Sequence, residues 1–551
     1  MITPLVPCSP TLVQAFCDVA QSISRSAEMN NPKRGVALSI AIGTVIAAVL
    51  FLVVNHLRKG SRRVPQPTVT VGVPTPSAGD LQRMEQVRET IRRVMSEKGI
   101  PSVTVAVARD GKILWEEGFG WADREKMTPA TPETMYSLAS ISKPITATGF
   151  MRLVEMRKVN LDKPANEYLG IGQIRGLAAD PSKATVRRVL SHTAGLPRHV
   201  QFFYSNESNR PPSMEETIAR YGVIIYPPGG AYEYSNLGFG ILDHIISRIS
   251  GQEFNDYMRT KVFAPLGLVH TSVNIGPGLE PFVAQRYDSQ LRPIPFYTFD
   301  HVGASAIYSS AHDLVRFGMF HLKQHLADQQ AILNDSTLDE MHQEVTTIQP
   351  NLGYALGWYT HSDHGYQFVA HTGGMPGVST MLALVPSENL AVVVLTNTET
   401  DSSKIRQAVI AFALPKYGEA LAKEGSQPEA KPQPFTPTAA LLGSWVGTVQ
   451  TWQGKLPITM VFKPDGDIHV KLGDNFESIL SDISFRNDIL TGSFASSIPT
   501  PDANLYRSDI DLKLWLRDGK LQGELSAVTS TDPEHYALSS YADLTKKASS
   551  N

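Results

Sequence analysis

Strand patterns lie at the two ends of one long region of this chain, and helical patterns fill the space between them. Near the start, residues 103–107 alternate valine with smaller residues, and an Asp-Gly pair at 110–111 follows as a tight turn. Near the end, residues 381–385 and 390–395 are apolar runs joined by a short polar turn. The economical arrangement is one antiparallel sheet built from both ends of the domain, with a helical insertion.

Three segments follow from this arrangement. The sheet and its helices predict an α/β (α+β) domain over residues 81–415, opened by a helix that Asp80 caps. Residues 416–438 are rich in Pro, Lys, Glu and Gln, which predicts a linker. Residues 439–545 alternate as short strands with Asp-Gly turns, which predicts a small all-β barrel. A Gly-x-Trp sequence at Trp445 resembles lipocalin-like domains, although a buried tryptophan anchoring a β core is the simpler interpretation.

The N-terminal part contains an uncharged apolar run, residues 35–54, that is long enough to cross a bilayer as a helix. The alternative is a cleaved signal peptide, but the run is longer than a usual signal core and lacks a small-residue cleavage site. The orientation of this anchor stays open, and so does the start of the chain, at Met1 or Met29. The expected segments are a tail at 1–34, a single transmembrane helix at 35–56 and a Pro-rich stalk at 57–80.

Composition limits the chemistry. The 50 Lys and Arg residues against 53 Asp and Glu give a net charge of −3, which disfavours a general nucleic-acid binder. Cys8 and Cys17 are the two cysteines, so a disulfide framework and a cysteine-rich metal site are both excluded. The pair His361 and His364 has no further ligand at a regular spacing, and we interpret it as a hairpin turn. No metal or other cofactor is expected.

Ser140 and Lys143 form the one Ser-x-x-Lys sequence of the chain. On a helix these positions share a face, so the two side chains can hydrogen-bond. A serine hydroxyl becomes a good nucleophile when a neighbouring group accepts its proton. Pro144 is tolerated only near a helix start, which places Ser140 in a first turn where free N–H groups favour negative charge. The alternative is an ordinary surface helix.

Two Tyr-Ser-Asn triplets are candidates for shared proton transfer. The triplet at Tyr204 lies in a polar run and predicts a solvated loop. The triplet from Tyr234 to Asn236 precedes an amphipathic helix, so a packed scaffold would hold it. We therefore select Tyr234 and Asn236.

A third candidate is a polar, glycine-containing sequence. His371, Thr372, Gly373 and Gly374 follow the strand-like residues 366–370, and we expect the strand to end there. Glycines let a backbone approach a ligand closely, and their N–H groups could face an oxyanion together with that of the serine. The alternative is a plain turn leaving a strand.

Taken together and in this order, SISK, YSN and HTG resemble the motifs of the serine β-lactamase and penicillin-binding-protein superfamily. The similarity is to its class C-like branch of esterases, D-stereospecific peptidases and β-lactamase-like proteins. The stretches LSHTAGL at 190–196 and APLGL at 264–268 match as well, and the resemblance covers about residues 81–414. It implies a β-lactamase-like fold. The second and third motifs depart from the class A versions.

The resemblance also implies a serine acyl-enzyme mechanism. Ser140 would attack a carbonyl, and Lys143 and Tyr234 would take its proton and return it to the leaving group. Which of the two is the base stays open. Asn236 would orient the substrate or Lys143. The N–H groups of Ser140 and Gly374 would form the oxyanion hole. His192, inside the matching SHTAGL stretch, is expected in a structural loop near the site.

His371 stands where true β-lactamases carry a lysine. A histidine is mostly neutral at pH 7, so we expect neutral ester or peptide substrates and slow antibiotic hydrolysis. The prediction is a membrane-anchored serine hydrolase for an ester or amide, with its catalytic domain outside the cytoplasm, in the periplasm or at the cell surface. The alternatives are a D-stereospecific peptidase, a weak β-lactamase or penicillin-binding protein, and a non-catalytic scaffold or receptor. The oligomeric state stays open.

Overall fold

The computed structural model describes residues 78–424 and 435–548. The predicted tail, transmembrane helix and most of the stalk lie outside these residues. The first described element is helix α3, Ala78–Lys98, so Asp80 lies inside a helix that begins earlier than its predicted cap. None of the helices in the described part of the chain is long and apolar enough to span a membrane.

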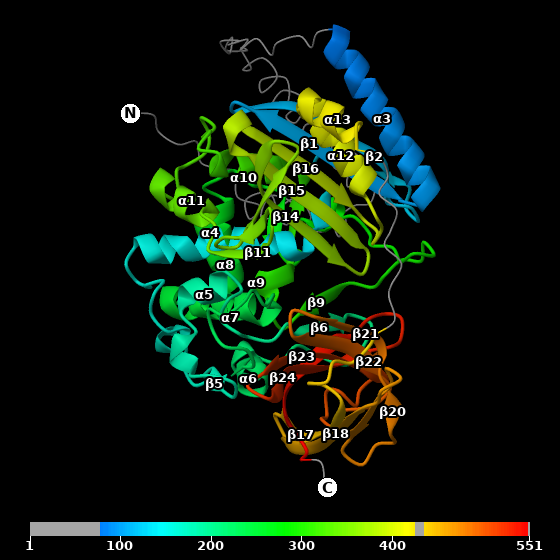
Figure 1. Cartoon of the computed structure of the whole chain (residues 1–551). Helices are drawn as coiled ribbons and strands as arrows, with labels where there is room; N and C mark the ends of the chain where they lie inside the picture. The colour runs from blue at the N-terminus through cyan, green and yellow to red at the C-terminus, as the bar shows by residue number, and fades with distance from the viewer. Residues whose placement is uncertain (1–77, 425–434, 549–551) are drawn as a thin grey trace, which may run out of the picture. The chain divides into compact units, whose positions relative to one another are not determined.

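A nine-stranded sheet forms the centre of the first domain, residues 78–421, which we call the sheet domain (Figure 1). Strand β1, Ser102–Arg109, pairs antiparallel with β16, Leu390–Thr396, and Val103 lies opposite Thr396. The two ends of the domain therefore meet in the middle of one sheet, as predicted. The other strands are β2 Lys112–Asp123, β3 Thr128–Pro129, β11 Thr346–Gln349, β12 Leu352–Tyr354, β13 Tyr359–Asp363, β14 Tyr366–Met375 and β15 Val378–Val385.

Both faces of this sheet are covered. Successive side chains of β16 point to opposite faces, and all of its residues are buried. Val392 and Val394 pack in the cluster that contains residues of α3 and of α12, Ser403–Ala413, whereas Val393 faces the main core. Helix α10, Ala311–His321, covers that second face. Ser310 caps α10, and its side chain accepts from the N–H of Asp313. Helix α13, Pro415–Leu421, occupies the start of the predicted linker, so the linker begins later than expected.

The helical insertion packs beside the sheet. Helix α4, Ser142–Glu155, contacts α7, Asn236–Ser250, and α9, Val302–Ser305, lies against both. The remaining elements are the helices α5 Val186–Leu190, α6 Met214–Tyr221, α8 Phe254–Met258 and α11 Asp335–His342, and the short strands β4 Met135–Ser137, β5 Arg175–Gly176, β7 Val223–Ile224, β8 Thr271–Val273 and β10 Ile307–Ser310.

The C-terminal domain is a nearly closed antiparallel barrel, which confirms the predicted β-barrel. It runs from β17, Gly443–Thr451, to β25, Tyr536–Lys546, and these two strands pair with each other. Trp445 is buried, and its indole N–H donates to the carbonyl of Leu441 at 2.8 Å, as expected of a core anchor. The strands between are β18 Gly454–Phe462, β19 Ile468–Leu472, β20 Ser478–Ile479, β21 Ser481–Arg486, β22 Ile489–Phe494, β23 Ser508–Arg517 and β24 Lys520–Thr529.

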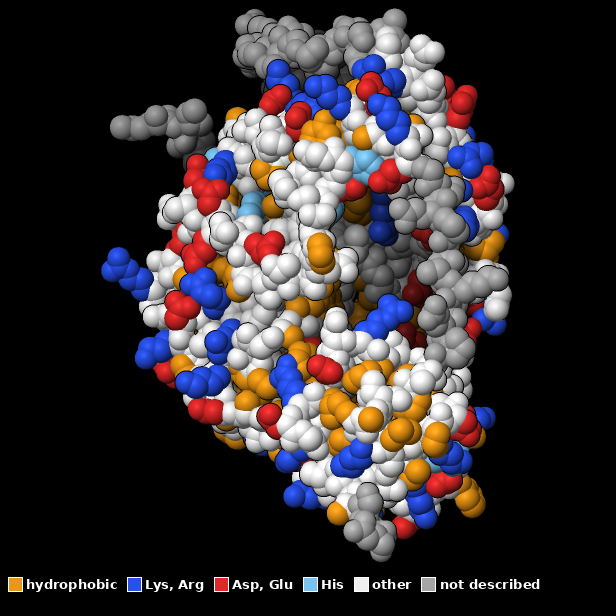
Figure 2. Space-filling view, viewed as in Figure 1, with side chains coloured by type: hydrophobic (Ala, Val, Ile, Leu, Met, Phe, Trp, Pro, Cys, Tyr) orange, Lys and Arg blue, Asp and Glu red, His pale blue; other side chains and the backbone are white. Residues whose placement is uncertain are grey.

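The barrel sheet continues into the sheet domain. Strand β25 pairs with β6, Val200–Tyr204, and β6 pairs with β9, Tyr297–Phe299. Tyr204 is therefore buried, and its hydroxyl donates to the carbonyl of Glu534 at 2.9 Å. The prediction of a solvated loop is wrong for Tyr204 itself, because the apolar residues before it form a strand. On the face drawn in Figure 2, basic and acidic side chains of the described residues are interspersed.

Candidate active site

Ser140 lies in a short 3-10 turn, Ala139–Ile141, directly before α4. Pro144 is in the first turn of α4, as its missing N–H requires. Ala139 has a φ of 49°, a left-handed conformation that is uncommon for a residue with a side chain. Strain of this kind occurs where the surrounding structure forces a turn, often at functional sites. The sharp turn holds the Ser140 side chain at the wall of a pocket.

Lys143 is fully buried and contacts Ser140. Its Nζ lies 3.1 Å from Ser140 Oγ, 2.8 Å from Asn236 Oδ1 and 3.1 Å from the carbonyl oxygen of Ala304. Burial and, secondarily, the positive charge of Arg198 hold the pKa of Lys143 well below its ordinary value. A lysine with a lowered pKa is neutral more often at moderate pH and can then accept a proton.

Tyr234 reaches the same serine from the other side. Its hydroxyl donates to Ser140 Oγ at 2.8 Å, and Lys143 Nζ lies 4.6 Å from the centre of its ring. Burial raises the pKa of Tyr234 above its ordinary value, against smaller lowering effects of Ser140 and Arg198. Burial thus favours the protonated phenol of Tyr234 and the neutral amine of Lys143.

The turn before α7 holds Tyr234 through its neighbours. Ser235 caps α7 by accepting from the N–H of Gly238 at 3.0 Å. The N–H of Ser235 donates to Nδ1 of His192 at 3.1 Å, so this buried histidine positions the turn, as its predicted structural place implies. Asn236 donates from Nδ2 to the carbonyl of His199 at 3.1 Å, which leaves its Oδ1 facing Lys143.

The glycines of the third motif lie inside a strand. Strand β14 runs on through Gly374 to Met375, so the expectation that it ends at the triplet is wrong. A Cβ at Gly373 would lie 2.1 Å from the carbonyl oxygen of Leu138, whereas a Cβ at Gly374 would meet nothing within 4 Å. Gly373 thus permits the strand to pack on the turn that carries the serine. Gly374 and the exposed Thr372 alternate with it on the other side of the strand.

His371 is buried against two tyrosine rings, Tyr354 and Tyr359. Its Nδ1–H donates to the carbonyl of Thr372 at 2.7 Å, and Nε2 accepts from the hydroxyl of Tyr354 at 3.2 Å. Burial and the charge of Lys143 lower the pKa of His371 to about 3. The ring is neutral at pH 7, in agreement with the charge expected from its residue type.

The pocket at Ser140 has a volume of about 460 Å³, and Tyr234, Asn236 and Gly374 line it as well. The structure therefore brings the three predicted motifs together at one cavity. His361 and His364 are elsewhere: His361 lies in β13, and His364 occupies the turn between β13 and β14, as predicted.

Several residues that line this pocket were not predicted from the sequence, and four of them carry a charged or imidazole side chain: Arg198, His301, Glu399 and Glu534. Glu534 comes from the barrel, in the connection between β24 and β25. Burial raises the pKa of Glu399 and Glu534 above its ordinary value. Arg198 lies two residues after the matching SHTAGL stretch, which was one signal for it. Nothing local in the sequence marks the other three.

Comparison with known proteins agrees with this geometry. The beta-lactamase family pattern matches residues 87–414, more than half of the chain. The chain belongs to the beta-lactamase family. Unguisins hydrolase ungD' of Aspergillus campestris is 30% identical over 347 residues, covering 60% of this chain and 64% of that protein. Penicillin-binding protein 4* of Bacillus subtilis is 26% identical over 353 residues, covering 59% of this chain and 74% of that protein.

The alignment with the first of these relatives thus spans less than two thirds of its length. Among solved structures, SurE aligns with a TM-score of 0.57 at 23% identity, over 85% of this chain and all of that chain. A class C beta-lactamase mutant, Y150F, aligns with a TM-score of 0.52 at 18% identity, over 62% of this chain and 99% of that chain. These likenesses show a shared beta-lactamase fold.

Proposed function

We propose that this beta-lactamase family protein is a serine hydrolase that cleaves an ester or amide through an acyl-enzyme on Ser140. The observation that carries the proposal is the position of Ser140 Oγ, 3.1 Å from Lys143 Nζ and 2.8 Å from the hydroxyl of Tyr234 at a pocket. A serine with a proton acceptor and a proton donor in direct contact meets the geometric requirement for nucleophilic catalysis.

In the first half of the reaction, neutral Lys143 takes the proton of Ser140 while Oγ attacks the carbonyl carbon. The directions of the two pKa shifts support this assignment, because burial favours the neutral amine and also the neutral phenol. The hydroxyl of Tyr234 then lies in position to pass a proton to the leaving group. Its phenol regains a proton from the Lys143 ammonium, and Asn236 Oδ1 holds that ammonium throughout.

Charge that develops on the carbonyl oxygen needs donors at its final position. We assign this role to the N–H groups of Ser140 and Gly374, which lie on the turn and on the strand that Gly373 brings together. Thr372 is exposed on the same side of β14 as Gly374 and is a candidate substrate contact. Water then attacks the acyl carbon, the same groups transfer the proton, and Ser140 is released.

The charged and neutral side chains at the pocket bear on which substrates it binds. The neutral, buried His371 supplies no cation at the third motif, which supports ester or amide substrates and slow hydrolysis of β-lactam antibiotics. A second candidate function, an amino-peptidase or amidase for D-amino-acid substrates, is favoured by one observation. Glu399 and Glu534 line the pocket as carboxylates for which the described residues provide no hydrogen bond or ion pair, so a substrate ammonium group would find partners there.

The competing class is a non-catalytic scaffold or receptor of the same fold. A fluorophosphonate probe separates the classes, since it phosphonylates an activated serine. We expect one adduct, located on Ser140 and absent from Ser140→Ala, while a Ser191→Ala control still reacts. An unlabelled wild-type protein that hydrolyses no ester would refute the hydrolase proposal.

A panel of short-chain p-nitrophenyl esters, D-amino-acid p-nitroanilides and nitrocefin then assigns the substrate class. We expect turnover of esters or anilides to exceed that of nitrocefin. Nitrocefin turnover as fast as ester cleavage would contradict the part of the proposal that rests on His371.

We further propose that residues 35–54 anchor the protein as a single-pass membrane protein, with its sheet domain and barrel outside the cytoplasm and residues 57–77 as a stalk. The support is the uncharged apolar run and its basic flanks. Carbonate extraction of membranes from cells expressing the full chain tests this, with a chain lacking residues 1–56 as the control. Release of the full chain by carbonate would contradict it.

A further inference from the structure

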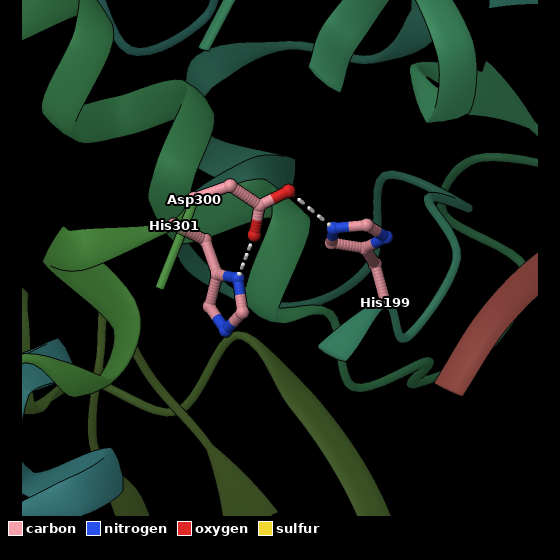
Figure 3. A group of neighbouring side chains, drawn as sticks. All are labelled: His199, Asp300 and His301. Carbon is pink, nitrogen blue, oxygen red and sulfur yellow. Dashed lines mark hydrogen bonds and ion pairs between the residues drawn. The ribbon is translucent and has the colours of Figure 1, made fainter. Parts of the chain in front are cut away.

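Three side chains outside the proton-transfer group form a hydrogen-bonded chain beside the pocket (Figure 3). Asp300 Oδ2 accepts from Nε2 of His199 at 2.8 Å, and Asp300 Oδ1 accepts from Nδ1 of His301 at 2.7 Å. Thr217 donates to Oδ2 as well, at 2.9 Å. All three residues of the chain are buried. One carboxylate thus orients two imidazole rings that extend from it in different directions.

The ligand atoms of this group lie within 4.8 Å of one another, a spacing that a metal site would also show. The hydrogen bonds argue for a different use. Nε2 of His199 and Nδ1 of His301 each lie within hydrogen-bond distance of the Asp300 carboxylate and donate an N–H to it. Neither nitrogen therefore has a free lone pair for a metal ion. The nitrogens that remain are Nδ1 of His199 and Nε2 of His301.

Nε2 of His301 is a buried atom with no hydrogen-bond partner among the described residues. Unpaired buried polar atoms are rare because each gives up the hydrogen bonds that water would supply, so such an atom needs a reason. His301 also lines the pocket that contains Ser140. Because Asp300 takes the hydrogen on Nδ1, the neutral ring presents a lone pair on Nε2. Burial, against the opposing effect of Asp300, lowers the pKa of His301 and favours this neutral form.

The backbone around His301 is held rigidly. A Cβ at Gly240, inside α7, would lie 2.8 Å from the Cβ of His301, so a glycine is required for this approach. The carbonyl of His301 accepts from the N–H of Ala304 at 3.0 Å, and the carbonyl of Ala304 accepts from Lys143. His301 is thus connected through one short helix to the proposed base.

The barrel supports the same group. His199 precedes β6 and Asp300 follows β9, the two strands through which the barrel sheet continues into the sheet domain. His199 has a φ of 46°, a strained conformation that the neighbouring strand pairing must maintain. The barrel therefore contributes to the placement of both histidine rings.

We propose that His301 is a substrate-binding residue whose Nε2 accepts a hydrogen bond from an N–H of the acyl group, next to the scissile carbonyl. This inference rests on the proposed acyl-enzyme function. The acyl group stays on Ser140 inside the pocket while the leaving group departs, and in this proposal it is the acyl group that lies against His301 in the pocket wall. The substrate class is an acylated amino acid or peptide rather than a simple alkyl ester.

The test uses two chromogenic esters that differ in one group. The p-nitrophenyl ester of N-acetylglycine carries the N–H, and p-nitrophenyl 4-oxopentanoate replaces this N–H by CH₂ at the same size. Rates are divided by those of alkaline hydrolysis to remove intrinsic reactivity. We expect the wild-type protein to prefer the N–H ester by about fivefold in kcat/KM, mainly through KM, as one neutral hydrogen bond provides. A wild-type ratio near one overturns the proposal without any variant.

Two substitutions of His301 form a matched pair. His301→Asn keeps an amide N–H for Asp300 and removes the acceptor from the pocket, so the ratio should fall to about one. His301→Gln places an amide group where Nε2 lies and should keep a ratio above two. A His301→Asn protein that folds, judged by its circular dichroism and Tm, and still prefers the N–H ester fivefold would overturn the proposal. Failure of the hydrolase function itself is distinct, because the wild-type protein would then cleave neither ester.

Discussion

The hydroxyl of Tyr234 lies 2.8 Å from Oγ of Ser140, although 94 residues separate the two in the chain. The contact depends on two helix starts, since Ser140 lies in the short 3-10 turn before α4 and Tyr234 directly precedes the cap of α7. These helices pack against each other, so their N-terminal ends place the two hydroxyl groups together. Proton transfer by positioned groups typically contributes 10²–10⁴-fold to a rate.

Removal of the Tyr234 hydroxyl tests this contact. We expect Tyr234→Phe to lower kcat for ester cleavage by about 100-fold or more, because the leaving group loses its proton donor. Tyr204→Phe is the matched control, as it lies in the other Tyr-Ser-Asn triplet and binds only a carbonyl oxygen. It should lower Tm slightly and change kcat less than threefold. Equal losses of kcat in both variants would contradict the assignment.

The pH profile should depend on Arg198. Burial and the charge of Arg198 lower the pKa of Lys143, and the mechanism needs Lys143 neutral. Activity therefore rises with pH as Lys143 loses its proton. Arg198→Gln removes a positive charge, so the pKa of Lys143 rises and the acidic limb of kcat/KM moves to higher pH. Arg259→Gln, an exposed arginine paired with Asp256, should leave the limb in place. A limb that moves to lower pH in Arg198→Gln would refute this electrostatic role.

Close packing at Gly373 predicts a loss of stability. A side chain there would overlap the Leu138 carbonyl, so Gly373→Ala should lower the free energy of unfolding by about 2 kcal/mol. The strand would move away from the turn that carries Ser140, and activity should fall with it. Gly374→Ala meets open space and should keep the wild-type Tm. Denaturant unfolding curves of the two variants provide the comparison. Equal stability of both would show that the close approach is not required.

A histidine whose pKa is lowered in the folded state predicts sensitivity to acid. Burial lowers the pKa of His342 to about 4, while the unfolded chain has a histidine pKa near 6.5. Between these values the unfolded state binds a proton that the folded state does not. The free energy of unfolding should therefore fall by about 1.4 kcal/mol per pH unit from this group as pH drops from 6.5 to 4.

His342→Gln is expected to remove the contribution of one proton to this slope, about 1.4 kcal/mol per pH unit. Urea unfolding at several pH values between 7 and 4 measures the slope, and an unchanged slope would count against a neutral His342 in the folded state. His342 lies outside the candidate site, and its Nε2 is 3.1 Å from Nδ1 of His321. The activity of the variant at pH 7 therefore provides a check on its folding.

The barrel carboxylate Glu534 predicts a charge preference. If an ammonium group binds between Glu399 and Glu534, Glu534→Gln should lower kcat/KM about tenfold for a D-amino-acid p-nitroanilide with a free amine. The N-acetylated analogue should change less than twofold. Glu477→Gln removes another barrel carboxylate, one that pairs with His469, and should affect neither substrate. A tenfold loss with both substrates would point to a structural role for Glu534 instead.

Local sequence patterns predicted much of this protein correctly. The hairpins at both ends, the helix after Tyr234 and the barrel all follow from periodicity and turn residues within short windows. The same reasoning was wrong about Tyr204, where polar neighbours suggested a loop. It was also wrong about the end of β14. At Tyr204 the strand β6 pairs with the distant strands β9 and β25, and that pairing outweighs local composition. Strand β14 continues through the glycines because it pairs with its neighbour β15 in a hairpin.

The sequence by itself determined which chemical groups are available: a serine and a lysine three residues apart, a tyrosine before a helix, and a histidine in place of a fixed cation. The tertiary structure alone decided the pKa values of these groups and which other residues lie beside them. Burial lowers the pKa of Lys143 and of His371, and distant segments bring His301 and Glu534 to the same pocket. The physical reason is that desolvation and long-range contact depend on the whole packed chain, whereas residue type and spacing are local properties.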